Sequence, residues 1–145
     1  MPETRNMTEG TPHYRYSETV APEDVDVIHA LLKTTYWASH RSRADIEGML
    51  KTSTFIAAFH GDGLVGFARA VTDKVTFTWI CDVVVEPEHR GCGIGKELVS
   101  RLMAHPHVVS TRKVLATRDA QGLYHQLGFI THPAECMIAY PERER

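Results

Sequence analysis

The chain has 145 residues, of which 43% are hydrophobic and 23% are charged, and its formal net charge is -2. This length and balance are typical of one soluble globular domain with a single hydrophobic core. The small net charge, without a block of Lys or Arg, argues against nucleic-acid binding. No apolar run approaches the roughly 20 residues that a membrane-spanning helix needs, so no membrane association is expected.

The first dozen residues are polar and contain Gly and Pro, so we expect 1–12 to be a flexible tail rather than a secretory signal. Three scattered cysteines form no CxxC pair, which indicates neither a disulfide framework nor a zinc ribbon. None of the nine histidines lies in HExxH or another ligand pattern, so no metal site is predicted. This cysteine usage favours a reducing, cytoplasmic location.

The N-terminal third predicts one strand and two helices. His13–Val20 alternates and predicts a strand. Pro22 can begin a helix, whose apolar residues recur at helical spacing as far as about Thr35. Ser42 can cap a second helix, with Asp45 three residues later as the other half of a capping box.

Strands dominate the middle of the chain. Thr54–Phe59 and Leu64–Val71 are strand-like, and the sequence HGDG between them has the turn chemistry of a hairpin. A longer β-rich run follows over Val75–Val85.

The last third alternates between helices and strands, which we expect at 93–103, 113–117, 120–127 and 137–140 in turn. The complete order is β-α-α-β-β-β-α-β-α-β, and no repeat or linker interrupts it. It predicts one mixed α/β domain over 13–141, followed by a short charged tail at 142–145.

The most informative segment is RGCGIG, Arg90–Gly95, which lies between the β-rich run and a helix. Its glycines let a ligand approach the backbone, and the N–H groups at a helix start favour phosphate. Arg90 and Lys96 can add positive charge there. The Walker A pattern fails, because Arg90 stands at its first glycine and Glu97 follows Lys96. The dinucleotide pattern GxGxxG also fails, since neither register has its third glycine.

RGCGIG resembles the pyrophosphate-binding motif Q/R-x-x-G-x-G/A of the GNAT superfamily of N-acetyltransferases. The preceding VVVEPEH, Val83–His89, looks like the family's fourth strand and turn. LYHQLGF, Leu123–Phe129, resembles a second family element, and the likeness spans about Thr54–Phe129. It implies a GNAT-like α/β fold with a mixed α+β sheet and a splay between the fourth and fifth strands, where the acetyl group would lie. The alternative for RGCGIG is a tight turn without a ligand.

The resemblance also implies acetyl-CoA as co-substrate. The loop and helix start would hold its pyrophosphate, and the preceding strand would bind the pantetheine arm as an added strand does. The cofactor-binding residues that follow from the resemblance are Val83, Val84, Val85, Arg90, Gly91, Cys92, Gly93, Ile94, Gly95, Lys96 and Tyr124.

Amine acetylation needs a neutral amine and an acid for the departing thiolate. Tyr124 matches the family's usual general acid, and its alternative role is to pack the last helix. Asp82 lies in the apolar sequence WICDV, and a carboxylate buried there is costly unless it has a partner or a function. It can accept the amine's proton, bind a cationic substrate, or simply pair with an arginine such as Arg69 or Arg118. These alternatives stay open, so Tyr124 and Asp82 are both candidate catalytic residues.

The connection between the two N-terminal helices, YWASHRSR at 36–43, lies where similar folds usually select the acceptor. Trp37 and Arg41, together with Asp82, are the candidate substrate-binding residues, suited to an aromatic or anionic acceptor. The alternative is a core tryptophan beside solvated arginines.

The predicted function is an acyl-CoA-dependent N-acetyltransferase that moves an acetyl group directly from acetyl-CoA to a primary amine of a small molecule. One alternative is acetylation of a protein or peptide amine. Another is a non-catalytic acyl-CoA-binding sensor, which the lack of an evident base motivates. Dimers are frequent among similar proteins, so a homodimer is allowed, although no segment indicates an interface.

Overall fold

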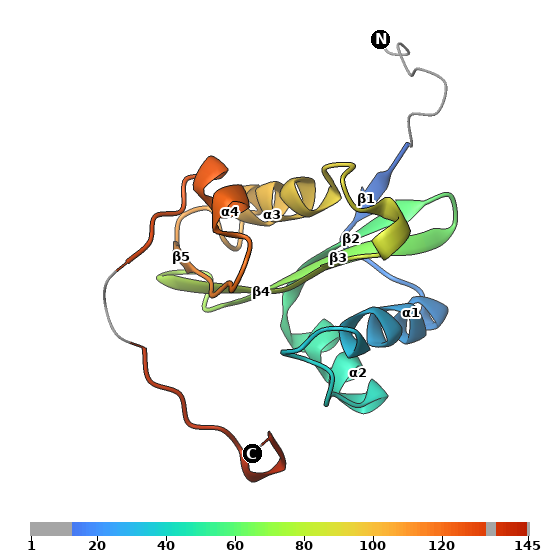
Figure 1. Ribbon diagram of the computed structural model, residues 1–145, viewed down its shortest axis with the longest axis horizontal. Coiled ribbons are helices and arrows are strands. Elements are labelled where there is room, and N and C mark those ends of the chain that lie inside the picture. The colour runs from blue at the N-terminus through green and yellow to red at the C-terminus, as the bar shows by residue number, and fades with distance from the viewer. Residues whose placement is uncertain (1–12, 133–135, 145) are drawn as a thin grey trace. The chain divides into compact units, whose positions relative to one another are not determined.

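A computed structural model describes residues 13–132 and 136–144. The chain divides into two compact units, Met1–Leu115 and Ala116–Arg145. The first contains a five-stranded sheet in the order β1-β2-β3-β4-β5 (Figure 1). Its strands are β1 (Arg15–Ser17), β2 (Thr54–His60), β3 (Gly63–Thr72), β4 (Phe77–Val85) and β5 (Arg112–Val114). Its helices are α1 (Pro22–Lys33), α2 (Arg43–Thr52), the 3-10 turn η1 (Pro87–His89) and α3 (Ile94–Ala104).

Helices cover both faces of this sheet: α1 and α2 lie on one face, and α3 lies on the other (Figure 1). The side of α1 that faces the core contributes Ile28 and Leu32, which have no exposed surface. On the other face, a Cβ atom at Gly66 of β3 would lie 3.0 Å from Ile94 Cγ2 of α3. Glycine is therefore what allows α3 to pack this closely on the sheet.

The two N-terminal helices begin where their capping residues predict. The Ser42 side chain accepts the Asp45 backbone N–H at 3.1 Å, and the Asp45 carboxylate accepts the Ser42 backbone N–H at 2.9 Å. This confirms the predicted capping box. The first helix ends at Lys33, two residues before the expected Thr35, and the backbone N–H groups of Thr34 and Thr35 bond the carbonyls of Leu31 and Leu32, three residues earlier, as in a turn.

The predicted hairpin is confirmed as the antiparallel pair of β2 and β3. Between β3 and β4 the register shifts, so Ala68 of β3 faces two residues of β4, Asp82 and Val83. This is a β-bulge, and Asp82 has a left-handed φ of 56°. A non-glycine residue in this region carries backbone strain, which persists only where the surroundings hold it.

The fifth strand is shorter than expected. It pairs in parallel with β4 only from Phe77 opposite Arg112 to Trp79 opposite Val114. Beyond that point, residues 80–85 of β4 have no described strand on this edge. The pairing therefore agrees with the divergence of the fourth and fifth strands that the family resemblance implies.

The second unit contains α4 (Gln121–Gln126) and the 3-10 turn η2 (Glu142–Glu144). The helix expected at 120–127 is present, one residue shorter at each end. The strand expected over Met137–Tyr140 is wrong: this segment is irregular, and Met137 is 95% exposed. Local alternation is not sufficient for a strand, because a strand also requires a neighbour that takes its backbone hydrogen bonds. Within 13–132 and 136–144, no helix is long and apolar enough to span a bilayer.

Candidate active site

The loop RGCGIG connects η1 to α3 and has the backbone of an anion site. Gly91 and Gly93 have left-handed φ values of 83° and 82°, and Gly93 is the N-cap of α3. The Gly93 carbonyl accepts the N–H of Glu97 at 3.0 Å, which starts the helical ladder. The N–H groups before that point have no acceptor within the helix, and this is the arrangement that favours anion binding at a helix start.

Contacts from the sheet hold this loop. Arg90 Nε donates to the Val85 carbonyl at 3.2 Å, and this hydrogen bond holds the start of the loop against the end of β4. Just before β1, Tyr14 Oη lies 2.8 Å from His89 Nδ1 of η1. Burial and the influence of the Cys92 side chain raise the pKa of Tyr14 to about 12, so its phenol stays protonated at neutral pH. Sequence reasoning missed this contact, because 75 residues separate Tyr14 from His89.

Gly93→Ala is expected to destabilise the protein by about 1 kcal/mol, because an L-residue with a Cβ atom is strained at positive φ. A Cβ atom at Gly93 would have no neighbour within 4 Å, so the change isolates backbone strain from steric overlap. Gly48→Ala is the matched control: its Cβ also has open space, but Gly48 lies inside α2. There alanine should stabilise by about 0.5–1 kcal/mol. Urea unfolding measures both, and equal effects would contradict the left-handed conformation of Gly93.

Asp82 is the centre of a buried group of polar side chains. Its side chain has no exposed surface, although it lies in the bulge of β4. Oδ2 accepts Arg41 Nη1 at 2.6 Å and Arg69 Nε at 2.8 Å. Oδ1 accepts Trp37 Nε1 at 3.2 Å. Of the alternatives that the sequence left open for Asp82, the structure therefore shows pairing with Arg69, and it adds Arg41 as a second partner.

These contacts bring the three candidate substrate-binding residues together. Trp37 and Arg41 lie in the connection between α1 and α2, which packs against the bulge through Asp82. Trp37 is 39% exposed and forms a T-shaped ring pair with Tyr36 at 4.9 Å. The side chain of Arg41 is 19% exposed. Each side chain therefore donates a hydrogen bond to the buried Asp82 carboxylate and is also partly exposed to solvent, so neither residue is fully buried or fully solvated.

On the edge of β4 away from β3, residues 83–85 pair with no strand of the described chain, while the Val85 carbonyl accepts Arg90 Nε. Val84 is buried, while Val83 and Val85 are half-buried. The adjacent Cys81 thiol is unsuited to nucleophilic attack at neutral pH, because burial raises its pKa to about 12. In the described part of the chain, no three His, Cys, Asp or Glu side chains are grouped as metal ligands.

Tyr124 lies on α4, in the unit Ala116–Arg145. It is 8% exposed, and its ring packs edge-on against Phe129 at 5.9 Å. Burial raises its pKa above the ordinary value of 10, so the phenol remains protonated at neutral pH. A buried, protonated phenol has the chemistry of a proton donor.

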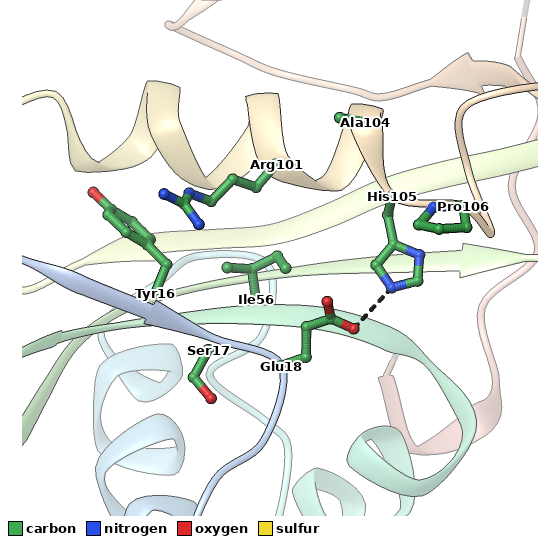
Figure 2. Close-up of a pocket in the computed structure, with 8 residues that line it drawn as sticks. All are labelled: Tyr16, Ser17, Glu18, Ile56, Arg101, Ala104, His105 and Pro106. Carbon is green, nitrogen blue, oxygen red and sulfur yellow. Dashed lines mark hydrogen bonds and ion pairs between the residues drawn. The ribbon is translucent and has the colours of Figure 1, made fainter.

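A pocket of about 330 Å³ lies at the opposite end of α3 from the loop, between that helix and β1 (Figure 2). His105 Nδ1 accepts the backbone N–H of His107 at 3.0 Å, so Nε2 carries the proton that is donated to Glu18 at 2.9 Å. The Arg101 guanidinium lies 4.4 Å from the centre of the Tyr16 ring. Arg101 Nε also donates to Glu97 at 2.7 Å, outside the pocket, so each charged group that lines the pocket has a partner. No sequence motif predicted this pocket.

Residues 51–131 match the family described as the acetyltransferase (GNAT) domain. The chain belongs to this family. The match includes β4, the glycine loop and Tyr124.

Two relatives illustrate the GNAT likeness. A protein of Xanthomonas campestris pv. campestris, described as belonging to the GNAT family, is 37% identical with a TM-score of 0.82, over 91% of this chain and 96% of that one. The uncharacterized N-acetyltransferase ycf52 of Pyropia yezoensis is 38% identical over 82 residues, 54% of this chain. The alignment covers 47% of ycf52, so the chain spans about half the length of this curated relative.

A third comparison is a likeness of fold alone. N-acetylglutamate synthase from Neisseria gonorrhoeae, solved in complex with coenzyme A and N-acetyl-glutamate, is 18% identical with a TM-score of 0.67. The alignment covers 79% of this chain and 28% of that protein.

Proposed function

We propose that this GNAT domain transfers an acetyl group from acetyl-CoA to a primary amine of a small molecule. The observation that carries the proposal is the loop Arg90–Gly95, whose left-handed glycines precede the start of α3 beside an open edge of β4. A pyrophosphate fits the helix start, and an extended arm with amide groups fits the strand edge. The GNAT fold neighbour that was solved with coenzyme A supports the choice of donor.

In this proposal, bound acetyl-CoA supplies an activated acetyl thioester, and the chain supplies binding and proton transfer. Arg90 and Lys96 contribute positive charge beside the pyrophosphate. Tyr124 protonates the departing thiolate, because its raised pKa keeps the phenol protonated until it is needed. The Asp82 side chain has no exposed surface and accepts three hydrogen bonds from neighbouring side chains, so we assign deprotonation of the amine to water rather than to this carboxylate.

The burial of Asp82 and its pairing with two arginines favour one alternative, a non-catalytic acyl-CoA sensor, because they leave no evident base. Acetyl-CoA binding is measured by calorimetry, and free thiol release is then measured over a panel of small amines and peptides. The proposal expects binding and thiol release with small amines. Binding without thiol release would indicate a sensor, and release with peptides alone would indicate protein acetylation.

For the measurement of acetyl-CoA binding, the chain offers a variant and a matched control. Arg90→Gln removes the charge at the loop and should weaken acetyl-CoA binding about tenfold. Arg43→Gln makes the same change on α2, where the guanidinium is 41% exposed and pairs with Asp26 and Glu47. It should leave binding unchanged. If the wild-type protein does not bind acetyl-CoA, the proposed function is wrong.

A further inference from the structure

The side chains around Asp82 carry an excess of positive charge. We call Trp37, Arg41, Arg69 and Asp82 the Asp82 cluster. Its two guanidinium groups face a single carboxylate, and their side chains are only 19% and 13% exposed. The charged groups that act on the neighbouring Cys81 thiol are Arg69, Asp82 and Arg41, which together leave one positive charge. A half-buried excess charge of this kind is costly unless an anion compensates it.

The same guanidinium groups have unused donors. A guanidinium has five N–H groups. Arg41 donates through Nη1, to Asp82 and to Met49 Sδ, and Arg69 donates through Nε to Asp82 and through Nη1 to Ser53 Oγ. Within residues 13–132 and 136–144, the Nε and Nη2 groups of Arg41 and the Nη2 group of Arg69 have no hydrogen-bond acceptor. Paired N–H groups on a guanidinium match the geometry of a carboxylate.

The position of the cluster connects it to the acceptor rather than to the donor. Asp82 lies in the bulge directly before Val83, within the part of β4, residues 80–85, that pairs with no described strand on the edge away from β3. Trp37 and Arg41 lie in the connection between α1 and α2 and reach Asp82 from there. Trp37 and Tyr36 also expose an aromatic pair there, 39% and 56% accessible. An acceptor at this place meets a positive charge and an aromatic surface together.

We propose that the Asp82 cluster binds a carboxylate of the acceptor, so that the acceptor is an amine that also carries a carboxylate, as amino acids do. Arg41 and Arg69 donate to that carboxylate. Asp82 is a positioning residue: it holds both guanidinium groups and the Trp37 ring against β4, and it offsets one of the two positive charges. This inference rests on the proposed function, since it names the acceptor class of the same site.

The test compares ligands that differ only in the carboxylate. Three such pairs are N-acetyltryptophan with N-acetyltryptamine, N-acetyltyrosine with N-acetyltyramine, and N-acetylphenylalanine with N-acetylphenethylamine. Binding of each to the protein is measured by calorimetry, with and without coenzyme A. We expect the carboxylate member of at least one pair to bind at least tenfold more tightly, because its hydrogen bonds are charge-assisted. Equal binding, or no measurable binding of any carboxylate member, overturns the inference.

Variants separate recognition from a merely structural role. Arg41→Gln should abolish the preference for the carboxylate member, Arg41→Lys should keep part of it, and the control Arg43→Gln on α2 should keep all of it. Thermal unfolding shows which variants are folded. If Arg41→Gln weakens both members of a pair equally, Arg41 has a structural role and the inference is overturned.

A turnover arm distinguishes this inference from the proposed function. With tryptophan and tryptamine as acceptors, the wild-type protein should have a higher kcat/KM for tryptophan, and Arg41→Gln should raise the KM for tryptophan with little change in kcat. Acetylation of tryptamine alone overturns the inference and leaves the proposed function standing. If the protein does not bind acetyl-CoA, the proposed function is wrong. Binding of the three pairs of N-acetylated ligands, measured without coenzyme A, then still tests this inference.

Discussion

Replacing Tyr124 by phenylalanine is expected to lower kcat for acetyl transfer by about 100-fold or more, which is the usual contribution of a positioned general acid. The change removes one hydroxyl group and keeps the ring that packs against Phe129. Binding of acetyl-CoA should therefore change little. Steady-state assays of thiol release, together with calorimetry of acetyl-CoA binding, separate the two effects.

The control is Tyr140→Phe, the same chemical change at a tyrosine that is 53% exposed, and it should leave kcat unchanged. The pH dependence gives a second readout. The pKa of Tyr124 is raised above 10, so its phenol is protonated below that pH. Loss of the phenol proton should therefore lower the kcat of the wild-type protein only above pH 10. Unchanged turnover in Tyr124→Phe would reject Tyr124 as the acid.

Asp82→Ala is expected to lower the free energy of unfolding by about 3–5 kcal/mol, the usual cost of removing one partner from a buried ion pair. The substitution leaves the guanidinium groups of Arg41 and Arg69 beside each other without the carboxylate that both contact. It also places alanine at a φ of 56°, where side chains other than those of Asn and Asp are rarely found. Urea unfolding followed by circular dichroism measures the loss.

Asp26→Ala provides the matched control, because Asp26 also pairs with an arginine, Arg43, but its side chain is 65% exposed. An exposed ion pair contributes little, so a loss of at most about 1 kcal/mol is expected. If Asp82→Ala were no more destabilising than Asp26→Ala, the two arginines would not depend on Asp82 in solution. The positioning role of Asp82 would then be wrong as well.

Several elements of the fold and the glycine loop were predictable from the sequence, because their causes lie within a few residues. The capping box depends on Ser42 and Asp45, three positions apart, and the hairpin depends on the turn sequence HGDG. The loop Arg90–Gly95 has left-handed glycines at the start of a helix, as its spacing indicates. In each case, local backbone preferences and nearby hydrogen bonds decide the conformation.

The tertiary structure alone decided the environment of Asp82 and the absence of the expected last strand. Sequence could say that a carboxylate in an apolar strand needs a partner. Only the fold shows that its partners are Arg69, 13 residues away, and Trp37 and Arg41, which are 45 and 41 residues away. Met137–Tyr140 alternates as a strand should, yet it is irregular. Both outcomes depend on which distant groups come together, and such contacts leave no periodic signal in the chain.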